Sequence, residues 1–233
     1  MEGLFAIQQK RPEGLPMISI EEQQKLLLNV SRRLKNKIAV YAVGGTAMMF
    51  SGLKESTLDI DLVFENEKDR DEFRKAAIEL GYREMDAIAI YGVKNNAPQM
   101  LKLDNERFDL FVGDVIDFVF SEDMKKRAVD MHQFEDKLLL KIADPHDLIL
   151  MKCATDRQKD ADDARRIIER TKIDWNVIIL EAQNQVKLGK EKAVFDIGCF
   201  LEKLKNELKV NVPQEVLDRL FKIVKKQAEE KIK

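Results

Sequence analysis

The sequence predicts an α/β (α+β) fold, in which a mixed sheet flanked by helices is followed by an all-helical C-terminal region. Up to residue 143, short apolar runs bounded by turn residues alternate with amphipathic stretches, as strands and helices with a shared core do. From Pro145 onward the periodicity is helical only. Helices are expected at residues 145–155, 158–171, 174–187, 191–209 and 213–231.

The expected organisation has three parts. Residues 1–35 form an N-terminal arm and a helix, in which residues 1–17 are a loose segment and Ser19 caps a helix over residues 19–35. Residues 36–143 form the α/β domain, and residues 144–233 form the helical domain. A cleft between two such lobes is a natural place for a ligand.

Composition limits the function classes. The 233 residues include 40 basic and 42 acidic ones, a net charge of −2. This balance argues against nucleic-acid binding by bulk charge and leaves a local basic patch open. We expect no membrane partner, because the start lacks signal-peptide features and no apolar run approaches the roughly 20 residues that cross a bilayer. Cys153 and Cys199 are expected to be core residues of a cytoplasmic protein.

One stretch stands out for its chemistry. Residues 38–43 are a continuous apolar run, typical of a buried strand, and end at Gly44-Gly45. We expect the two glycines to form a turn into a short helix over residues 46–50, which Ser51-Gly52 closes. Backbone N–H groups at such a helix start suit a phosphate.

The next expected strand, residues 58–64, carries Asp59 and Asp61 in an alternating pattern. Side chains two apart on a strand share a face, so the two carboxylates should converge. A carboxylate pair without a cation costs free energy. Hard oxygen ligands suit Mg²⁺, or Mn²⁺, that enters with a nucleotide.

Further elements follow in order. A helix is expected at residues 67–80, stopped by Gly81, and strands at residues 82–93 and 99–103, joined by a turn at residues 94–98. A strand at residues 107–112 carries Asp109, and further apolar runs occupy residues 115–120 and 137–142. Asp109 is either a third carboxylate brought to Asp59 and Asp61 by the sheet or an ordinary solvent-facing residue.

Two motifs together resemble the nucleotidyltransferase superfamily, which has the polymerase-β-like fold. The first is Gly44-Gly45, a spacer of about a dozen residues and Asp59-Ile60-Asp61-Leu62, within residues 38–64. The second spans residues 144–166 and contains Asp144-Pro145-His146-Asp147-Leu148, Lys152 and the run from Arg157 to Asp163. This second motif, which is expected to form a pair of helices, and Thr57 are similar to the motifs of the minimal and abortive-infection-toxin-like branches of the superfamily.

The resemblance implies roles for particular residues. Asp59 and Asp61 would bind divalent ions, and Asp109 would assist metal binding or take the proton from an attacking hydroxyl. Lys152 would reach the phosphates from the helical lobe. The triphosphate of a nucleotide would be held by the residues of the glycine turn, which are Gly44, Gly45 and Thr46.

The resemblance also implies a metal-dependent transferase that moves a nucleoside monophosphate from a nucleoside triphosphate such as ATP to a hydroxyl group. The acceptor is left open between a transfer RNA or other RNA, a protein and a small molecule such as an aminoglycoside. The toxin-like branch adds a toxin–antitoxin system with an antitoxin partner. The alternative is a catalytically silent nucleotide-binding or partner-binding module, and the presence of all three aspartates favours the enzyme. A plain α/β domain with incidental acidic strands is the third interpretation.

Other polar residues have structural interpretations. The spacing of Arg157, Asp160 and Asp163 favours an ion network between helices, and Lys152 is equally compatible with a solvated helix face. His132 and His146 have no second nitrogen or sulfur ligand nearby in the sequence, so a zinc site is not expected.

Overall fold

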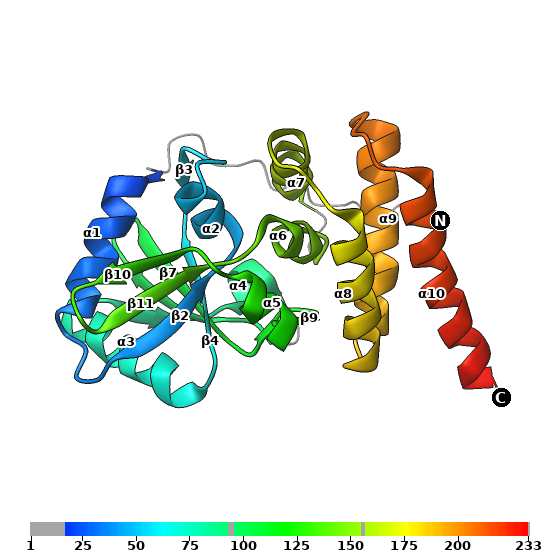
Figure 1. Cartoon of the computed structure of the whole chain (residues 1–233). Coiled ribbons are helices and arrows are strands. Elements are labelled where there is room, and N and C mark those ends of the chain that lie inside the picture. The colour runs from blue at the N-terminus through cyan, green and yellow to red at the C-terminus, as the bar shows by residue number, and fades with distance from the viewer. Residues whose placement is uncertain (1–16, 93–95, 155–156, 233) are drawn as a thin grey trace, which may run out of the picture.

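The computed structural model describes residues 17–92, 96–154 and 157–232. It has an α/β part and a helical part, as the sequence predicts, and Figure 1 shows the two side by side. The predicted arm at residues 1–17 lies outside the described residues except for Met17. The predicted turn at residues 94–98 is described only from Asn96 onward.

The chain enters the fold through a capped helix. A two-residue strand, β1 (Ile18–Ser19), leads into α1 (Ile20–Ser31). The Ser19 hydroxyl accepts the Glu22 N–H, and the Glu22 carboxylate accepts the Ser19 N–H, which together form a capping box. The helix therefore starts where the sequence predicts. It ends at Ser31, four residues before the predicted end.

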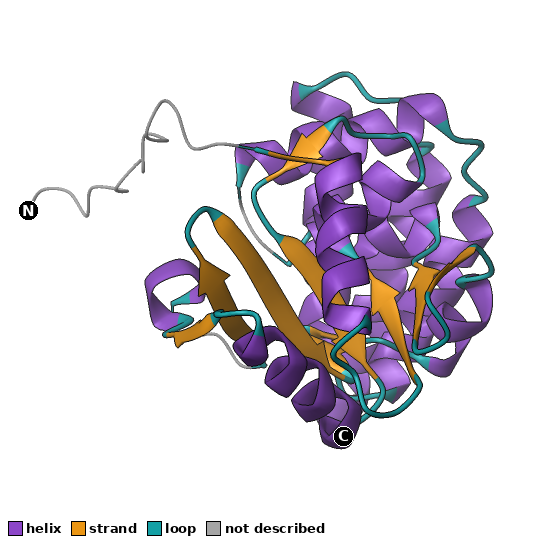
Figure 2. Cartoon of the chain, turned by 90° about the vertical axis from the view of Figure 1, so that its left-hand side faces the viewer, coloured by secondary structure: helices purple, strands orange, loops and turns teal. Residues whose placement is uncertain are grey.

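A mixed sheet forms the centre of the α/β part. Among the described residues its strand order is β10-β11-β2-β4-β7-β6-β5, and a small hairpin of β8 and β9 is attached to β7. The strands are twisted into a fan in Figure 2. Their bounds are β2 Ile38–Ala42, β3 Ser56–Thr57, β4 Ile60–Phe64, β5 Arg83–Met85, β6 Gln99–Leu103, β7 Glu106–Val112, β8 Asp114–Val115, β9 Phe118–Val119, β10 Met131–Phe134 and β11 Leu138–Ile142. β3 lies outside this sheet and pairs with β1.

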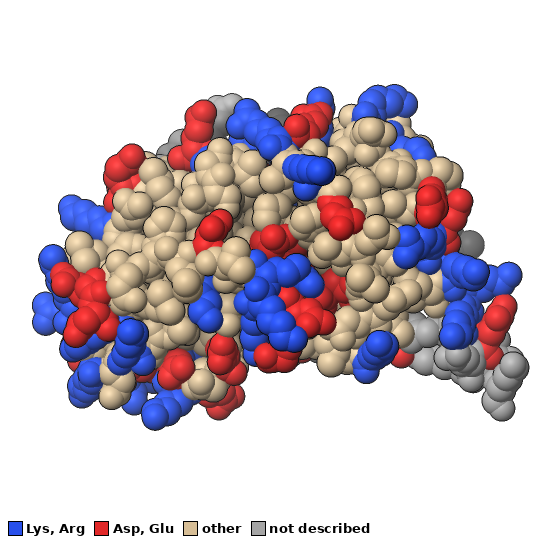
Figure 3. Space-filling view, in the orientation of Figure 1, with Lys and Arg blue, Asp and Glu red and all other residues tan. Residues whose placement is uncertain are grey.

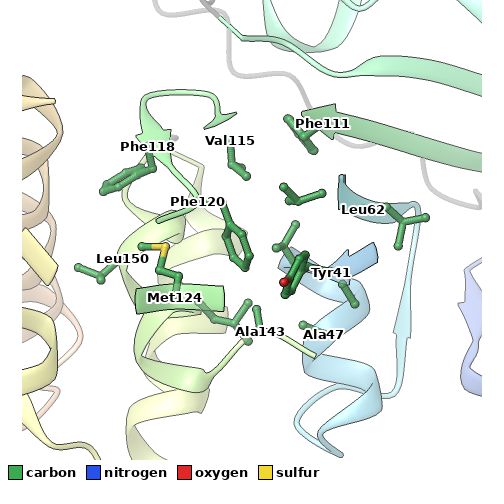
Figure 4. Packing of buried hydrophobic residues seen from close by; sticks show 14 of the residues in the cluster. Tyr41, Ala47, Leu62, Phe111, Val115, Phe118, Phe120, Met124, Ala143 and Leu150 are labelled. Carbon is green, nitrogen blue, oxygen red and sulfur yellow. The ribbon is translucent and has the colours of Figure 1, made fainter. Parts of the chain in front are cut away.

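Helices pack on both faces of the sheet. α3 (Glu67–Glu79) packs on one face, where Phe73 meets the rings of Phe64 and Phe108 at 5.5 and 5.3 Å. The opposite face carries α2 (Gly44–Phe50), α5 (Glu122–Arg127) and the first helix of the C-terminal region. Figure 4 shows the core on this second face, where the rings of Tyr41 and Phe120 lie 5.0 Å apart. Both faces of the central strands are therefore buried.

The predicted strand over residues 82–93 is wrong beyond its first residues. β5 ends at Met85, and a short helix, α4 (Ile88–Tyr91), follows. The Asp86 carboxylate accepts the Ile88 N–H, which starts the helical turn. Ile88 and Ile90 are 62% and 41% exposed. Their apolar pattern therefore does not reflect burial in a sheet, and the periodicity was misleading here.

The helical region follows the sequence closely. Asp144 and Asp174 cap helices as expected, since their side chains accept the N–H groups of His146 and Asn176. The helices are α6 Pro145–Lys152, α7 Gln158–Arg170, α8 Trp175–Lys187, α9 Glu191–Glu207 and α10 Gln214–Ile232. In the described residues, no helix combines the length and apolar character that a membrane span requires. Cys153 is buried, whereas Cys199 is exposed and is not the core residue predicted.

A buried polar network joins the helical region to the α/β part. The Gln185 side chain of α8 accepts the Val119 N–H at 3.0 Å and donates to the Val119 carbonyl at 2.8 Å, as a neighbouring strand would. Arg127 of α5 donates to Asp147 of α6 at 2.7 Å and to Glu181 of α8 at 2.6 Å. These bonds fix the position of α6 relative to the sheet.

Candidate active site

The two glycines are the first residues of α2, which starts two residues earlier than the sequence predicts. α2 begins at Gly44, whose φ of +55° lies in the region that favours glycine. A Cβ atom at Gly44 would lie 2.4 Å from a carboxylate oxygen of Asp61. A Cβ atom at Gly45 would lie 2.4 Å from the Thr57 hydroxyl. Both positions exclude a side chain because the β3–β4 segment packs directly against them.

Thr46 anchors β4. Its side chain is fully buried, and its hydroxyl accepts the Asp61 N–H at 2.9 Å. The residue thus holds the backbone of Asp61 against α2. The structure gives Thr46 this positioning role, whereas Gly44 and Gly45 line the cleft described below.

Three carboxylates converge beside α2. Asp61 of β4 and Asp109 of β7 are directly opposite each other in the parallel pairing of the two strands, and therefore point to the same face. Asp59 lies in a bend before β4 and not within the strand as predicted, and the Thr57 hydroxyl donates to it at 3.2 Å. One oxygen from each of the three side chains lies within 4.8 Å of the others.

Asp109 is fully buried and well bonded. Arg107, two residues earlier on the same face of β7, donates from Nε to Asp109 Oδ1 at 2.9 Å and from Nη2 to Oδ2 at 3.0 Å. The Tyr91 hydroxyl of α4 donates to the same Oδ2 at 2.7 Å. Arg107 Nη2 also donates to Asp59. Burial raises the pKa of Asp109 to about 6 although Arg107 acts to lower it.

Asp61 has a different environment. No hydrogen bond to its carboxylate arises from any residue that the structure describes. Burial, followed by the negative charges of Asp59 and Asp109, raises the pKa of Asp61 to about 8. A carboxylate without a partner beside two others is a position that a cation would stabilise. The donor set, all carboxylate oxygen, fits Mg²⁺ or Mn²⁺.

Basic side chains form the opposite side of the site. Lys152 of α6, 8% exposed, donates from Nζ to Asp160 at 2.9 Å and to Asp163 at 2.7 Å, both on α7. Lys54 donates to the two oxygens of Asp163 at 2.9 and 2.8 Å, and Arg157 donates to Asp160 at 2.7 Å. The expected ion network between helices is therefore present, and Lys152 belongs to it.

Lys159 differs from its neighbours on this side. It lies in the first turn of α7 and lines the cleft, and within the described part of the chain its amino group has no hydrogen-bond or ion-pair partner. Its positive charge acts on Asp61. Lys159 is thus a basic group available to an anionic ligand.

A cleft separates the acidic and basic sides. It has a polar portion between Asp59 and Asp61 on one side and the four basic residues Lys54, Lys152, Arg157 and Lys159 on the other. Its lining also has an apolar portion, which consists of Val43, Tyr91, Phe111, Val115, Ile116, Leu148 and Met151. A ligand with a polyanionic part and a flat apolar part fits these two portions.

The structure brings most of the predicted site together. Asp59, Asp61 and Asp109 meet, Gly44 lies beside Asp61 and Gly45 beside Thr57, and Lys152 lines the same cleft. Sequence reasoning assigned no site role to Arg107, Tyr91, Lys54 or Lys159. Arg107 carried a usable signal, because it shares the strand face of Asp109 two residues away. Lys54 and Tyr91 carried none, because loop and helix packing places them.

The comparisons with known proteins give structural matches only. No protein-family model matches the chain, and no curated protein matches it. One similar solved structure is ANT(2″)-Ia in complex with adenylyl-2″-tobramycin, with a TM-score of 0.41, 16% identity, and coverage of 78% of this chain and 98% of that one. Another is an inferred nucleotidyltransferase from H. pylori, with a TM-score of 0.41, 14% identity, and coverage of 91% and 97%.

Both similar structures have TM-scores below 0.5, so the nucleotidyltransferase superfamily stays a prediction from the sequence. The toxin-like branch stays a prediction. At these identities and TM-scores the matches say nothing about the activity or the ligands of this chain.

Proposed function

We propose that the chain is a metal-dependent nucleotidyltransferase that moves a nucleoside monophosphate from a nucleoside triphosphate to a hydroxyl group. The observation that carries the proposal is the cleft lined by Asp59, Asp61 and basic groups, with the buried Asp109 carboxylate within 4.8 Å of the two acidic side chains. Transfer at an α-phosphorus needs both, because the reacting phosphate must be positioned and its charge stabilised.

The chain's residues supply position and charge. Lys159 and Lys152 would attract the triphosphate, and Gly44 and Gly45 line the same cleft. The apolar portion, including Tyr91 and Met151, accommodates the base. Few hydrogen-bonding groups line that portion, so shape would govern the choice of base.

The carboxylates would hold the metal. Asp61 and Asp59 are its proposed ligands, and Asp109 either completes the ligand set or accepts the proton of the attacking hydroxyl. A bound Mg²⁺ supplies Lewis-acid activation of that hydroxyl and stabilisation of the pyrophosphate leaving group. The hydroxyl oxygen forms the new bond to the α-phosphorus as the bond to the pyrophosphate breaks.

The surface charge narrows the choice of acceptor but does not identify it. Figure 3 shows acidic and basic side chains interspersed over one face of the molecule, without a continuous basic surface. This distribution disfavours an extended nucleic-acid contact on that face. RNA ends, protein side chains and small molecules stay the acceptors to test, and an antitoxin partner stays a prediction.

A label-transfer assay tests the proposal. The chain is incubated with Mg²⁺ and each of four α-labelled nucleoside triphosphates, alone and with transfer RNA or an aminoglycoside. The Asp61→Asn variant should lose at least about a thousandfold in rate, because it removes a proposed metal ligand. Asp162→Asn is the matched control, since Asp162 is exposed on α7 and bonds only Gln158 among the described residues.

Label that moves to an acceptor with wild-type and Asp162→Asn, and not with Asp61→Asn, supports the enzyme. Nucleotide binding without transfer to any acceptor favours the catalytically silent module. The absence of both binding and transfer contradicts the proposal.

A further inference from the structure

Arg107 forms ion pairs with two of the three clustered carboxylates, those of Asp59 and Asp109. Its guanidinium contacts both oxygens of Asp109 and one oxygen of Asp59, and its side chain is only 16% exposed. The fork geometry suits this arrangement, because Nε and Nη2 donate in parallel to one carboxylate. Arg107 therefore neutralises the Asp59–Asp109 edge and does not contact Asp61.

The balance of charge limits what else the site holds. Three carboxylates and one guanidinium leave a formal charge of −2, which one divalent ion cancels. A divalent ion that binds Asp59 must compete with Arg107 for that carboxylate and is repelled by its charge. The oxygens of a nucleotide triphosphate would offset this repulsion.

We propose that Arg107 is a fixed cation of the site that weakens its affinity for free divalent ions, so that tight metal binding depends on a bound nucleotide. This inference rests on the proposed function, because it takes the carboxylate set as the metal site. It assigns Arg107 a role in regulating metal affinity. A merely structural Arg107 would keep the carboxylates together and so support metal binding.

The two roles predict opposite results for Arg107→Gln. If Arg107 competes with the ion, the variant binds Mn²⁺ without nucleotide at least about tenfold more tightly than wild type, since one unit of opposing charge a few ångströms away is removed. If Arg107 only organises the carboxylates, the variant binds Mn²⁺ equally or more weakly, and the proposal is overturned. The measurement is the electron paramagnetic resonance signal of free Mn²⁺ during titration.

Controls locate the effect. Arg83→Gln removes an exposed arginine of β5 whose side chain has no hydrogen-bond partner in the described residues, and should leave Mn²⁺ affinity unchanged. The double variant Arg107→Gln with Asp61→Asn should lose the gain, because the ion then lacks a ligand. A gain that survives in the double variant would place the ion elsewhere and overturn the proposal.

Folding of the variant is checked by thermal unfolding, because Asp109 loses its charged partner in Arg107→Gln and keeps only the Tyr91 hydroxyl. Saturating Mn²⁺ should raise the melting temperature of Arg107→Gln more than that of wild type. Arg107→Lys serves if the first variant does not fold. Lysine keeps the charge but has one nitrogen, and a single nitrogen bridges Asp59 and Asp109 less completely. Arg107→Lys should therefore bind Mn²⁺ about threefold more tightly than wild type, and equal or weaker binding counts against the proposal.

The outcome is separable from that of the proposed function. Tighter Mn²⁺ binding by Arg107→Gln without any label transfer would support the role of Arg107 and contradict the enzyme. Label transfer by wild type together with unchanged or weaker Mn²⁺ binding by Arg107→Gln would support the enzyme and overturn the proposed role of Arg107.

Discussion

Close contacts at single residues decide the geometry of the site. Gly44 and Gly45 are needed for what they touch, since a Cβ atom at either position would overlap a polar side chain of the β3–β4 segment. The Asp61 side chain therefore packs against the start of α2, and the Thr46 hydroxyl accepts the backbone N–H of Asp61. The glycine pair and the acidic strand are thus one packed unit.

Gly44→Ala should damage activity more than stability. The new Cβ atom would displace the Asp61 carboxylate, and the residue would also have a positive φ. We expect a loss of at least about a hundredfold in transfer rate, with about 1–2 kcal/mol of destabilisation. Gly52→Ala is the control, because Gly52 also has a positive φ but faces open space. Equal losses of activity in the two variants would show that strain, not displacement of Asp61, is responsible.

Two of the lysines that line the cleft, Lys152 and Lys159, should separate binding from folding. Lys159→Met removes a cation without a partner in the described residues, so nucleotide affinity should fall about tenfold with the melting temperature unchanged. Lys152→Met leaves Asp160 and Asp163 buried with less compensation, and should cost about 3–5 kcal/mol of stability. Calorimetric nucleotide titration and urea unfolding measure the two effects. A destabilised Lys159→Met variant would contradict this division.

At the scale of elements, a few polar bonds set how α5, α6 and α8 meet. Arg127 joins the three helices through Asp147 and Glu181, which are 0% and 2% exposed. The Ser121 hydroxyl and the Gln185 amide also donate to Glu181, at 2.8 and 3.0 Å. Since α6 carries Lys152, this network positions the basic side of the cleft.

Arg127→Met should therefore loosen the helices and the cleft together. Two buried carboxylates would lose their cation, at a cost of about 3–5 kcal/mol. Arg165→Met is the control, because Arg165 is exposed and pairs only with Glu169 at 2.7 Å among the described residues. Urea unfolding measures the difference. A cost below about 1 kcal/mol for Arg127→Met would show that the network contributes little.

At the scale of the whole molecule, the same network makes stability depend on pH. Burial raises the pKa of Asp147 to about 6, although its hydrogen bonds and the charge of Arg127 act to lower it. The folded state therefore holds a proton between about pH 4 and pH 6 that the unfolded state has released. Stability contributed by this group falls as the pH rises through that window and is constant above it.

Asp147→Asn should remove this decline. Between pH 4 and pH 7, wild type should lose roughly 2–3 kcal/mol of unfolding free energy relative to Asp147→Asn. Urea unfolding at several pH values measures it, and Asp162→Asn serves as the exposed control. A constant difference across the range would show that the pKa of Asp147 is not raised.

Local signals predicted much of the fold. The caps Ser19, Asp144 and Asp174 and the strand at residues 99–103 were predicted correctly, and the strand predicted at residues 38–43 ends one residue earlier, at Ala42. Each of these signals acts within a few residues along the chain, so it can be read without the fold. The failure at residues 82–93 arose because Asp86 starts a helical turn in an apolar run that the sheet does not bury.

The sequence by itself determined that a Gly-Gly pair precedes two aspartates and that a helical region follows an α/β part. Only the tertiary structure decided that Asp109 joins them, because the pairing of β4 with β7 is a contact between distant segments. It likewise decided that Arg107 neutralises the Asp59–Asp109 edge and that the Asp61 carboxylate has no hydrogen-bond partner among the described residues. Such contacts depend on strand register and helix packing, which no local pattern encodes.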